Sequence, residues 1–289
     1  MRIAPGWKEY ELIDASGGQR LERWGDVTLI RPDPQVIWNT EKKNPKWQSA
    51  DAVYNRSDSG GGKWQYRRRI PDEWMISWDS KIKLYVTPTG FKHTGVFPEQ
   101  AANWTIYDKL IIGAKKEIRV LNLFGYTGAA TVACLKAGAS VCHVDASKGM
   151  VGAAKRNVEL NGLEDAAVRY IVDDCAKFVA REIRRGQRYD AIIMDPPSYG
   201  RGPSGEMWRL EDNIYDFAVL CREVLSEEPL FVALNSYTAG LAPAVSGYVL
   251  SAALKEFGGR TQSEEIGLRV TESGLALPCG ATAIHMFLD

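Results

Sequence analysis

The chain has 289 residues, of which 45% are hydrophobic and 25% are charged. This length predicts about two domains, and the composition excludes a disordered or fibrous chain. Because the 36 basic and 36 acidic residues cancel, no overall charge predicts a nucleic-acid or membrane partner, and any such partner must be argued from a local patch.

The sequence predicts a cytoplasmic protein without membrane attachment. No apolar run reaches the roughly 18 residues of a membrane span, and Met1 to Glu9 lack the apolar core of a signal peptide. The five cysteines form no C-x-x-C pair, and only three histidines accompany them. We therefore expect reduced thiols, with neither a metal site nor a disulfide framework.

The first 92 residues are predicted to form a small, mostly β domain. Eight of the nine tryptophans lie in the first 104 residues. Short apolar runs alternate there with turn formers such as Gly17-Gly18, Gly60-Gly61-Gly62 and Pro71-Asp72, which is typical of hairpins.

Residues 93–289 are predicted to form one α/β domain. Apolar, β-branched runs alternate with helical stretches, a pattern that predicts a parallel, doubly wound, Rossmann-like sheet. The expected strands are 118–123, 140–144, 167–172, 189–194 and 230–234, and the expected helices are 129–137, 149–160, 175–185, 212–225 and 244–257. Residues 266–270 and 281–288 are expected to form an antiparallel edge pair.

The first expected strand is followed by a turn that contains glycine, Phe124 to Gly128. In open α/β sheets, ligands bind at the carboxyl ends of the strands near the switch point, and glycine lets the backbone approach a ligand closely. The turn is not the dinucleotide fingerprint, which needs glycine where Thr127 stands. An ordinary βα turn is the alternative.

Acidic residues follow the next three strands. Asp145 can accept hydrogen bonds from both ribose hydroxyls of a nucleoside cofactor, although a helix-capping aspartate is the alternative. Asp173 and Asp174 stand where an acid can face an adenine amino group. The fourth strand leads into Asp195-Pro196-Pro197-Ser198-Tyr199. The two prolines fix φ and remove two donors, so this loop is predicted to present Asp195 rigidly.

Six ordered motifs resemble the class I S-adenosylmethionine-dependent methyltransferases, and among them the bacterial group that methylates carbon 5 of cytosine or nitrogen 7 of guanine in 23S ribosomal RNA. The resemblance covers about residues 95 to 240. The motifs are HTGVFPEQ from His93, NLFGYTGAAT from Asn122, VDAS from Val144, KRNVELNGL from Lys155, DDCAKF from Asp173 and YDAIIMDPPSYG from Tyr189. The resemblance implies S-adenosyl-L-methionine as cofactor and ribosomal RNA as substrate.

The resemblance also implies the site residues. Phe124 to Gly128 would line the methionine end of the cofactor, Asp145 would hold the ribose, and Phe97 to Gln100 would close over the site. The implied cofactor-binding residues are Gln100, Asn122, Phe124, Gly125, Tyr126, Thr127, Gly128, Asp145, Ala146, Asp173, Asp174 and Asp195. The implied catalytic residues are Asp195, Pro196, Pro197 and Tyr199.

Two departures from the group bear on the methylated atom. Cytosine-modifying members carry a cysteine after the fifth strand, because carbon 5 becomes nucleophilic only after a thiolate adds to carbon 6, but Leu234 to Thr238 contain no thiol. Cys175 is the nearest candidate and would lie beside the adenine. Amino-group methyltransferases place an aromatic directly after the two prolines, where this chain has Ser198 and then Tyr199. We therefore predict direct transfer to a ring nitrogen, with Tyr199 stacking on the base.

A basic segment, residues 42–69, holds eight basic residues against Asp51 and Asp58. Cations for phosphates and flat rings for unstacked bases are what single-stranded RNA recognition needs. The rings in this segment are Trp47, Tyr54, Trp64 and Tyr66, and the predicted RNA contacts are Lys63, Arg67, Arg68 and Arg69. A hairpin with a solvated charged face and an aromatic core face is the equal alternative.

Three functions are compatible with these features: an RNA methyltransferase, a methyltransferase of a small molecule or protein, and an RNA-binding module that holds the cofactor without turnover. The basic segment favours the first over the second, and the Asp195-Pro196-Pro197 loop argues against the third. No pattern in the sequence indicates an oligomeric state.

Overall fold

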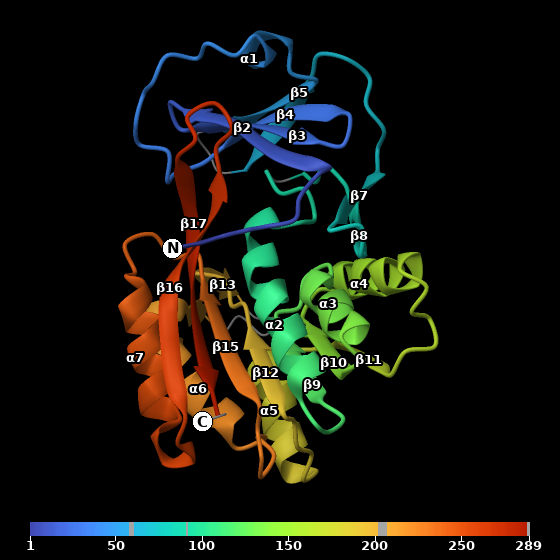
Figure 1. The fold of residues 1–289 in the computed structure, drawn as a ribbon, viewed down its shortest axis with the longest axis vertical. Helices are drawn as coiled ribbons and strands as arrows, with labels where there is room; N and C mark the ends of the chain where they lie inside the picture. Colours follow the sequence, from blue (N-terminus) through green and yellow to red (C-terminus); the bar gives the residue numbers. More distant parts are fainter. Residues whose placement is uncertain (58–60, 91, 202–206, 288–289) are drawn as a thin grey trace. The chain divides into compact units, whose positions relative to one another are not determined.

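The computed structural model describes residues 1–57, 61–90, 92–201 and 207–287, and the chain divides into two compact units (Figure 1). Unit 1 comprises Met1–Ala102 and Ile266–Cys279, and unit 2 comprises Asn103–Glu265 and Gly280–Asp289. The α/β fold class with a β-rich N-terminal region is confirmed. The domain boundary at residue 92 stays a prediction, and the units differ from it because a C-terminal segment joins unit 1.

Unit 2 holds most of a mostly parallel sheet in which the order of strands is β1-β16-β17-β15-β12-β9-β10-β11; β1 and parts of β16 and β17 belong to unit 1. Strand β9 pairs in parallel with both β10 and β12, so the chain changes its winding direction at β9. The switch point expected in such a sheet therefore lies between β9 and β12. The parallel strands are β9 (Arg119–Leu123), β10 (Ser140–Asp145), β11 (Val168–Val172), β12 (Ala191–Met194) and β15 (Phe231–Ser236).

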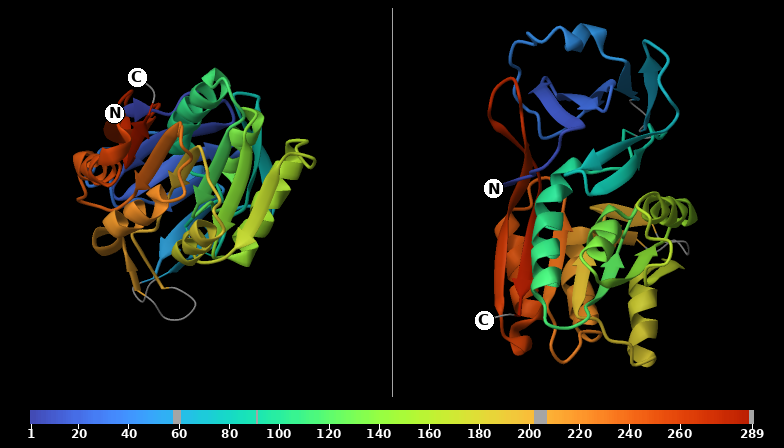
Figure 2. Two further views of the ribbon diagram at one scale, coloured as in Figure 1. Left: turned by 90° about the horizontal axis from the view of Figure 1, so that it is seen from below. Right: turned by 45° about the vertical axis from the view of Figure 1, so that its right-hand side comes forward.

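Helices cover both faces of this sheet, as the alternating pattern predicts (Figures 1 and 2). One face carries α2 (Ala101–Gly113), α3 (Ala129–Lys136) and α4 (Lys148–Leu160), and the other carries α5 (Cys175–Arg184), α6 (Leu210–Arg222) and α7 (Pro243–Ala253). Under α5 to α7 lies a hydrophobic core in which strand residues such as Leu121 and Met194 pack against helix residues such as Phe178. A 3-10 turn, Lys255–Phe257, follows α7.

The C-terminal strands are longer than the sequence predicts. β16 (Arg260–Arg269) begins six residues before the expected strand, and β17 (Ala276–Met286) begins five residues before its expected strand, which shortens the connection between them; Leu288 lies outside the described residues. β17 pairs antiparallel with β15. The expectation of an edge pair was wrong in one respect, because β1 (Arg2–Ile3) pairs with β16 and occupies the edge.

Unit 1 contains a five-stranded sheet of order β2-β3-β4-β5-β6 and the hairpin β7-β8. Its elements are β2 (Tyr10–Ser16), β3 (Gln19–Trp24), β4 (Val27–Pro32), α1 (Lys46–Ser49), β5 (Ala52–Arg56), β6 (Gly62–Tyr66), β7 (Trp74–Trp78), β8 (Ile82–Val86) and the 3-10 turn Pro98–Gln100. Trp24 is fully buried and packs edge-on against Tyr10, with ring centroids 4.6 Å apart. Thr271 and Glu272 donate backbone hydrogen bonds to β2, which explains why the C-terminal segment belongs to this unit.

Candidate functional site

The turn between β9 and α3 holds backbone conformations that side chains rarely adopt. Phe124 and Tyr126 have φ angles of 57° and 50°, and Gly128 has 82°. Left-handed residues other than glycine cost on the order of 1–3 kcal/mol each and concentrate at functional sites. At Gly128 a Cβ would lie 2.7 Å from the Cβ of Ala154. Surrounding contacts, such as the close approach of Ala154 to Gly128, therefore hold this turn in its unusual backbone conformation.

Asp145 joins this turn to the end of β10. One carboxylate oxygen accepts the N–H of Tyr126 at 2.9 Å, and the other accepts the N–H of Ser147 at 2.8 Å. The N-cap of α4 is Ser147, whose hydroxyl accepts the N–H of Met150, so Asp145 is not the helix cap. Each Asp145 oxygen retains a second acceptor site, which makes this half-buried carboxylate available to a pair of hydroxyls.

A buried polar chain lies beneath the glycine turn. The side-chain amide of Asn122 donates to the Thr131 hydroxyl at 2.9 Å, and that hydroxyl lies 2.9 Å from Nδ1 of His143. Burial lowers the pKa of His143 to about 4, so the ring is neutral at pH 7. A Cβ on Gly125 would lie 2.4 Å from the His143 ring. Asn122, an implied cofactor contact, thus directs its amide into the interior, under the turn.

The residues after β11 also have structural partners. Asp174 is the N-cap of α5 and accepts the N–H of Lys177 at 2.9 Å. Asp173 forms an ion pair with Arg181, and its backbone N–H donates to the carbonyl of Asp145 at 3.1 Å. The ends of β10 and β11 are therefore tied together, whereas contact of either aspartate with an adenine stays a prediction.

The loop after β12 is braced by two other elements. The backbone N–H of Asp195 donates to the Leu123 carbonyl at 3.3 Å. The indole N–H of Trp208 donates to the Pro197 carbonyl at 2.6 Å, and the Thr238 hydroxyl donates to the Ser198 hydroxyl at 2.8 Å. These contacts agree with the rigid loop expected from the two prolines.

Trp208 and Thr238 were missed by the sequence analysis. Trp208 lies on β14 (Met207–Arg209), which pairs with β13 (Tyr199–Arg201) in a hairpin. Its ring centroid is 5.6 Å from that of Phe124, so it contacts both the loop after β12 and the turn after β9. Trp208 is the only tryptophan beyond residue 104 in the sequence, and this isolated position could have marked it as a candidate site residue. Tyr199 is 54% exposed, which leaves most of its ring uncovered.

All five cysteines are free and buried. Burial raises the pKa of Cys142 to about 11 and that of Cys134 to about 12, and it raises the pKa of Cys175, Cys221 and Cys279 further. Because only a thiolate attacks a pyrimidine carbon, none of these thiols is poised as a nucleophile.

The structure changes the interpretation of the basic segment in unit 1, part of which, residues 58–60, lies outside the described residues. Trp47 and Tyr54 are buried, so for these two rings the structure favours the alternative of an aromatic core face. The Trp47 indole donates to Asp14, because a core tryptophan needs an acceptor for its N–H. Arg67 donates to the carbonyls of α1, and Arg68 pairs with Asp51. Lys63, Tyr66 and Arg69 are exposed, and so are Arg67 and Arg68 despite these contacts.

The implied residues thus fall into three groups. Hydrogen bonds link the turn after β9, Asp145, Asp173 and Asp195 at one edge of the unit 2 sheet. Ala146 is exposed beside Asp145. Gln100 is buried at the end of the Pro98–Gln100 turn in unit 1, and its contact with a cofactor stays a prediction. Within the described ranges, no group of three metal-binding side chains is present, and no helix is long and apolar enough to cross a membrane.

Comparisons with known proteins agree with this geometry. A family model described as S-adenosylmethionine-dependent methyltransferase matches residues 92–211. A solved SAM-dependent methyltransferase from Agrobacterium tumefaciens is 35% identical and superposes with a TM-score of 0.93, covering 99% of this chain and 93% of that one. A methyltransferase solved as a complex with SAH, at 20% identity, covers 98% of this chain and 76% of that one with a TM-score of 0.72, and it supports the fold.

Curated relatives named ribosomal RNA large subunit methyltransferase I match a shorter stretch. The relative from Cronobacter sakazakii is 30% identical over 214 residues, which are 67% of this chain and 52% of the relative. The relative from Tolumonas auensis is 33% identical over 158 residues, which are 51% of this chain and 39% of the relative. The chain spans about half the length of these relatives or less.

Proposed function

Because this chain belongs to the S-adenosylmethionine-dependent methyltransferases, we propose that its methyl acceptor is a base of ribosomal RNA. The observation that carries the proposal is the match, over 214 and 158 residues of this chain, to relatives named as ribosomal RNA methyltransferases. The exposed cations Lys63 and Arg69 of unit 1 are compatible with an RNA partner.

The residues at the sheet edge fit the cofactor. The Asp145 carboxylate has unused acceptor sites for the two ribose hydroxyls. Gly128 caps α3 without a side chain, so the first-turn N–H groups can bind the carboxylate end of the methionine portion. Asp173 and Asp174 follow β11, where we propose that they contact the adenine. Bound S-adenosyl-L-methionine supplies a methyl group already activated by its sulfonium.

We propose direct transfer without a covalent enzyme–RNA intermediate. The acceptor lone pair must be aligned with the methyl group and water must be excluded, and the braced loop from Asp195 to Tyr199 offers a rigid frame for that alignment. Asp195 would orient the base, and Tyr199 would stack on it. The raised pKa values of all five cysteines oppose a thiolate route.

Mass spectrometry of ribosomal RNA nucleosides tests this function. A deletion strain should lack one methylated nucleoside, and the wild-type gene should restore it whereas an Asp195→Ala gene should not. An unchanged nucleoside profile, together with methyl transfer by the purified protein to a small molecule or protein, would overturn the RNA assignment. Trapping with 5-fluorocytosine-substituted RNA tests the route, because a denaturant-stable adduct would restore transfer to cytosine carbon 5.

A further inference from the structure

The imidazole ring of His143 lies directly beneath the turn after β9. His143 belongs to β10, and its side chain is fully buried. A Cβ built on Gly125 would lie 2.4 Å from Cε1 and 2.5 Å from Nδ1 of this ring, and 3.2 Å from the amide of Asn122. Gly125 has no left-handed φ that would itself require glycine. The ring is therefore the main reason why no side chain fits at this position.

Gly125 connects this ring to Asp145. The N–H of Gly125 donates to the Val144 carbonyl at 3.0 Å, and its carbonyl accepts the N–H of Gly128 at 2.9 Å. The next residue, Tyr126, donates its N–H to the Asp145 carboxylate at 2.9 Å. Because a rigid peptide unit joins Gly125 to this donor, a displacement of Gly125 would move one of the two groups that fix Asp145.

Stability alone does not explain a histidine at this position. Nδ1 of His143 lies 2.9 Å from the Thr131 hydroxyl, but Nε2 is buried and has no hydrogen-bond partner among residues 1–57, 61–90, 92–201 and 207–287. A buried polar atom without a partner costs free energy of folding, and an apolar side chain of similar volume would avoid this cost. Departures of this kind are expected at functional sites.

We propose that His143 is a positioning residue for the cofactor: its ring holds Gly125 in place, and the turn in consequence keeps the Asp145 carboxylate in line with the two ribose hydroxyls. The inference rests on the proposed contact between Asp145 and the ribose, which it deepens by naming what sets the geometry of that contact. Since the ring is fully buried, it acts through Gly125 and Tyr126. Its removal should weaken recognition of the ribose hydroxyls more than binding of the rest of the cofactor.

Calorimetry with S-adenosylhomocysteine and its 2′-deoxy analogue tests this role. The ratio of the two affinities reports the contact to the 2′-hydroxyl, whereas a general loosening of the fold would weaken the binding of both ligands alike. A hydrogen bond to a charged group should give the wild type a preference of about tenfold or more, and His143→Ala should reduce it to about threefold or less. All measurements are made at a temperature at which circular dichroism shows each variant to be folded.

The matched control is His285→Ala. His285 is also buried in unit 2, and its Nδ1 lies 2.8 Å from the hydroxyl of Thr261. It lies on β17, which is adjacent to neither β9 nor β10 in the sheet. The change therefore removes a similar ring and a similar hydrogen bond from another part of the unit. It should lower stability and leave the preference for the ribose compound unchanged.

Gly125→Ala tests the same contact from the other side, with His143 intact. Its methyl group would meet the ring, so this variant should also lose the preference. In the double variant with His143→Ala the methyl group no longer meets a ring, so the double variant should be no worse than His143→Ala alone. Losses that multiply, as they do for independent sites, would overturn the proposed contact.

Two failures can be told apart. If the wild type prefers S-adenosylhomocysteine and His143→Ala keeps that preference, His143 does not position the carboxylate, and only this inference fails. If the wild type shows no preference, Asp145 does not hold the ribose, so the proposed placement of the cofactor fails and the inference fails with it. Neither measurement uses RNA, so neither outcome depends on the identity of the methyl acceptor.

Discussion

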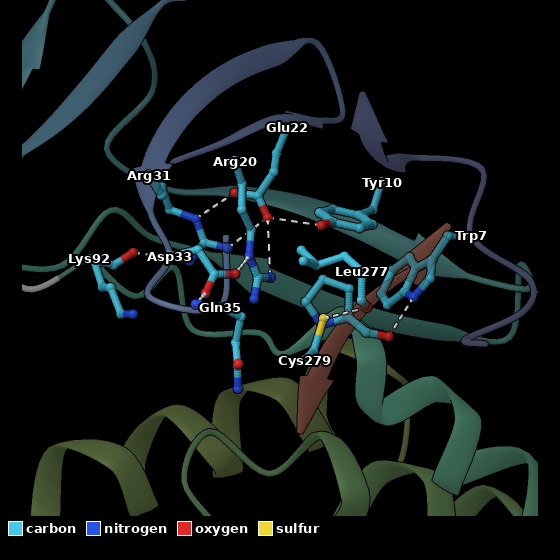
Figure 3. Close-up of polar contacts among 11 residues, drawn as sticks. Trp7, Tyr10, Arg20, Glu22, Arg31, Asp33, Gln35, Lys92, Leu277 and Cys279 are labelled. Carbon is cyan, nitrogen blue, oxygen red and sulfur yellow. Dashed lines mark hydrogen bonds and ion pairs between the residues drawn. The ribbon is translucent and has the colours of Figure 1, made fainter. Parts of the chain in front are cut away.

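The sheet edge of unit 2 and the buried ion pair of Glu22 with Arg31 in unit 1 (Figure 3) hold their carboxylates in opposite ways. Asp145 is half-buried and is fixed by two backbone N–H groups, which leaves acceptor capacity for a ligand. Glu22 is fixed by Arg31 and Tyr10, and it is fully buried. A half-exposed carboxylate held by backbone can serve a ligand, whereas one buried against side chains chiefly supports the fold. Changes in the two regions should therefore have separable effects.

The largest expected effect is on stability, from Glu22→Gln. Removing this charge leaves Arg31 buried without its partner, and breaking a buried pair costs about 3–5 kcal/mol. Urea denaturation should show this loss, while calorimetry on the folded fraction should show unchanged cofactor affinity. The control is Glu11→Gln, whose partly exposed pair with Arg23 should contribute no more than about 1 kcal/mol. Equal losses for both variants would contradict the distinction between the regions.

Asp195→Ala should produce the largest effect on activity. If Asp195 orients the acceptor, the loss appears at the transition state, and we expect turnover to fall by about 10²- to 10³-fold with cofactor affinity changed only a few-fold. Single-turnover methyl transfer and calorimetry separate the two quantities. Asp216→Ala, an exposed change on α6, should alter neither. A parallel loss of affinity and turnover would assign Asp195 to cofactor binding.

The pH dependence of stability tests the buried chain under the glycine turn. Because the pKa of His143 is about 4 in the folded protein against 6.5 as its ordinary value, folding favours the neutral ring. This contribution, about 3 kcal/mol at most, is fully present above pH 6.5 and is lost as the pH falls toward 4. The wild type should therefore lose more unfolding free energy between pH 7.5 and 4.5 than His143→Gln does. Equal losses would show that His143 is not buried as a neutral ring.

The sequence predicted the sheet edge better than the elements that brace it. Alternating apolar runs and helical stretches located β9, β10 and β12 in the sequence. Because the carboxyl ends of such strands lie at one edge of the sheet, the positions of Asp145 and Asp195 at that edge could be predicted. Helix α2 was missed because it is apolar nearly all round, with Trp104 and Tyr107 both buried, and it lacks the amphipathic period of a surface helix. The role of Trp47 stayed open because a ring among lysines fits both base stacking and an aromatic core face, and only the fold shows that its ring turns inward toward Asp14.

Asp145→Ala should lower cofactor affinity without a comparable loss of stability. Removing an acceptor for two ribose hydroxyls should cost about 1–3 kcal/mol of binding, measured by calorimetry. Asp145→Asn, which keeps one acceptor for a backbone N–H, should cost less. Ser147→Ala removes the helix cap next to it, so it should lower stability by about 1 kcal/mol and leave affinity nearly unchanged. Undiminished affinity in Asp145→Ala would remove this residue from the cofactor site.

The smallest expected effect is that of replacing the cysteines. Cys175 lies at the start of α5, nearest to the sheet edge, but burial raises its pKa, so almost no thiolate exists at neutral pH. Turnover of Cys175→Ser and Cys175→Ala should stay within about threefold of the wild type, because direct transfer needs no thiol. Both variants remove the sulfur, but only Cys175→Ser buries a hydroxyl, which would lower the stability of the fold. A loss of 10³-fold or more in both, with normal folding, would show that a buried thiol becomes the nucleophile once RNA is bound, and that this part of unit 2 rearranges on binding.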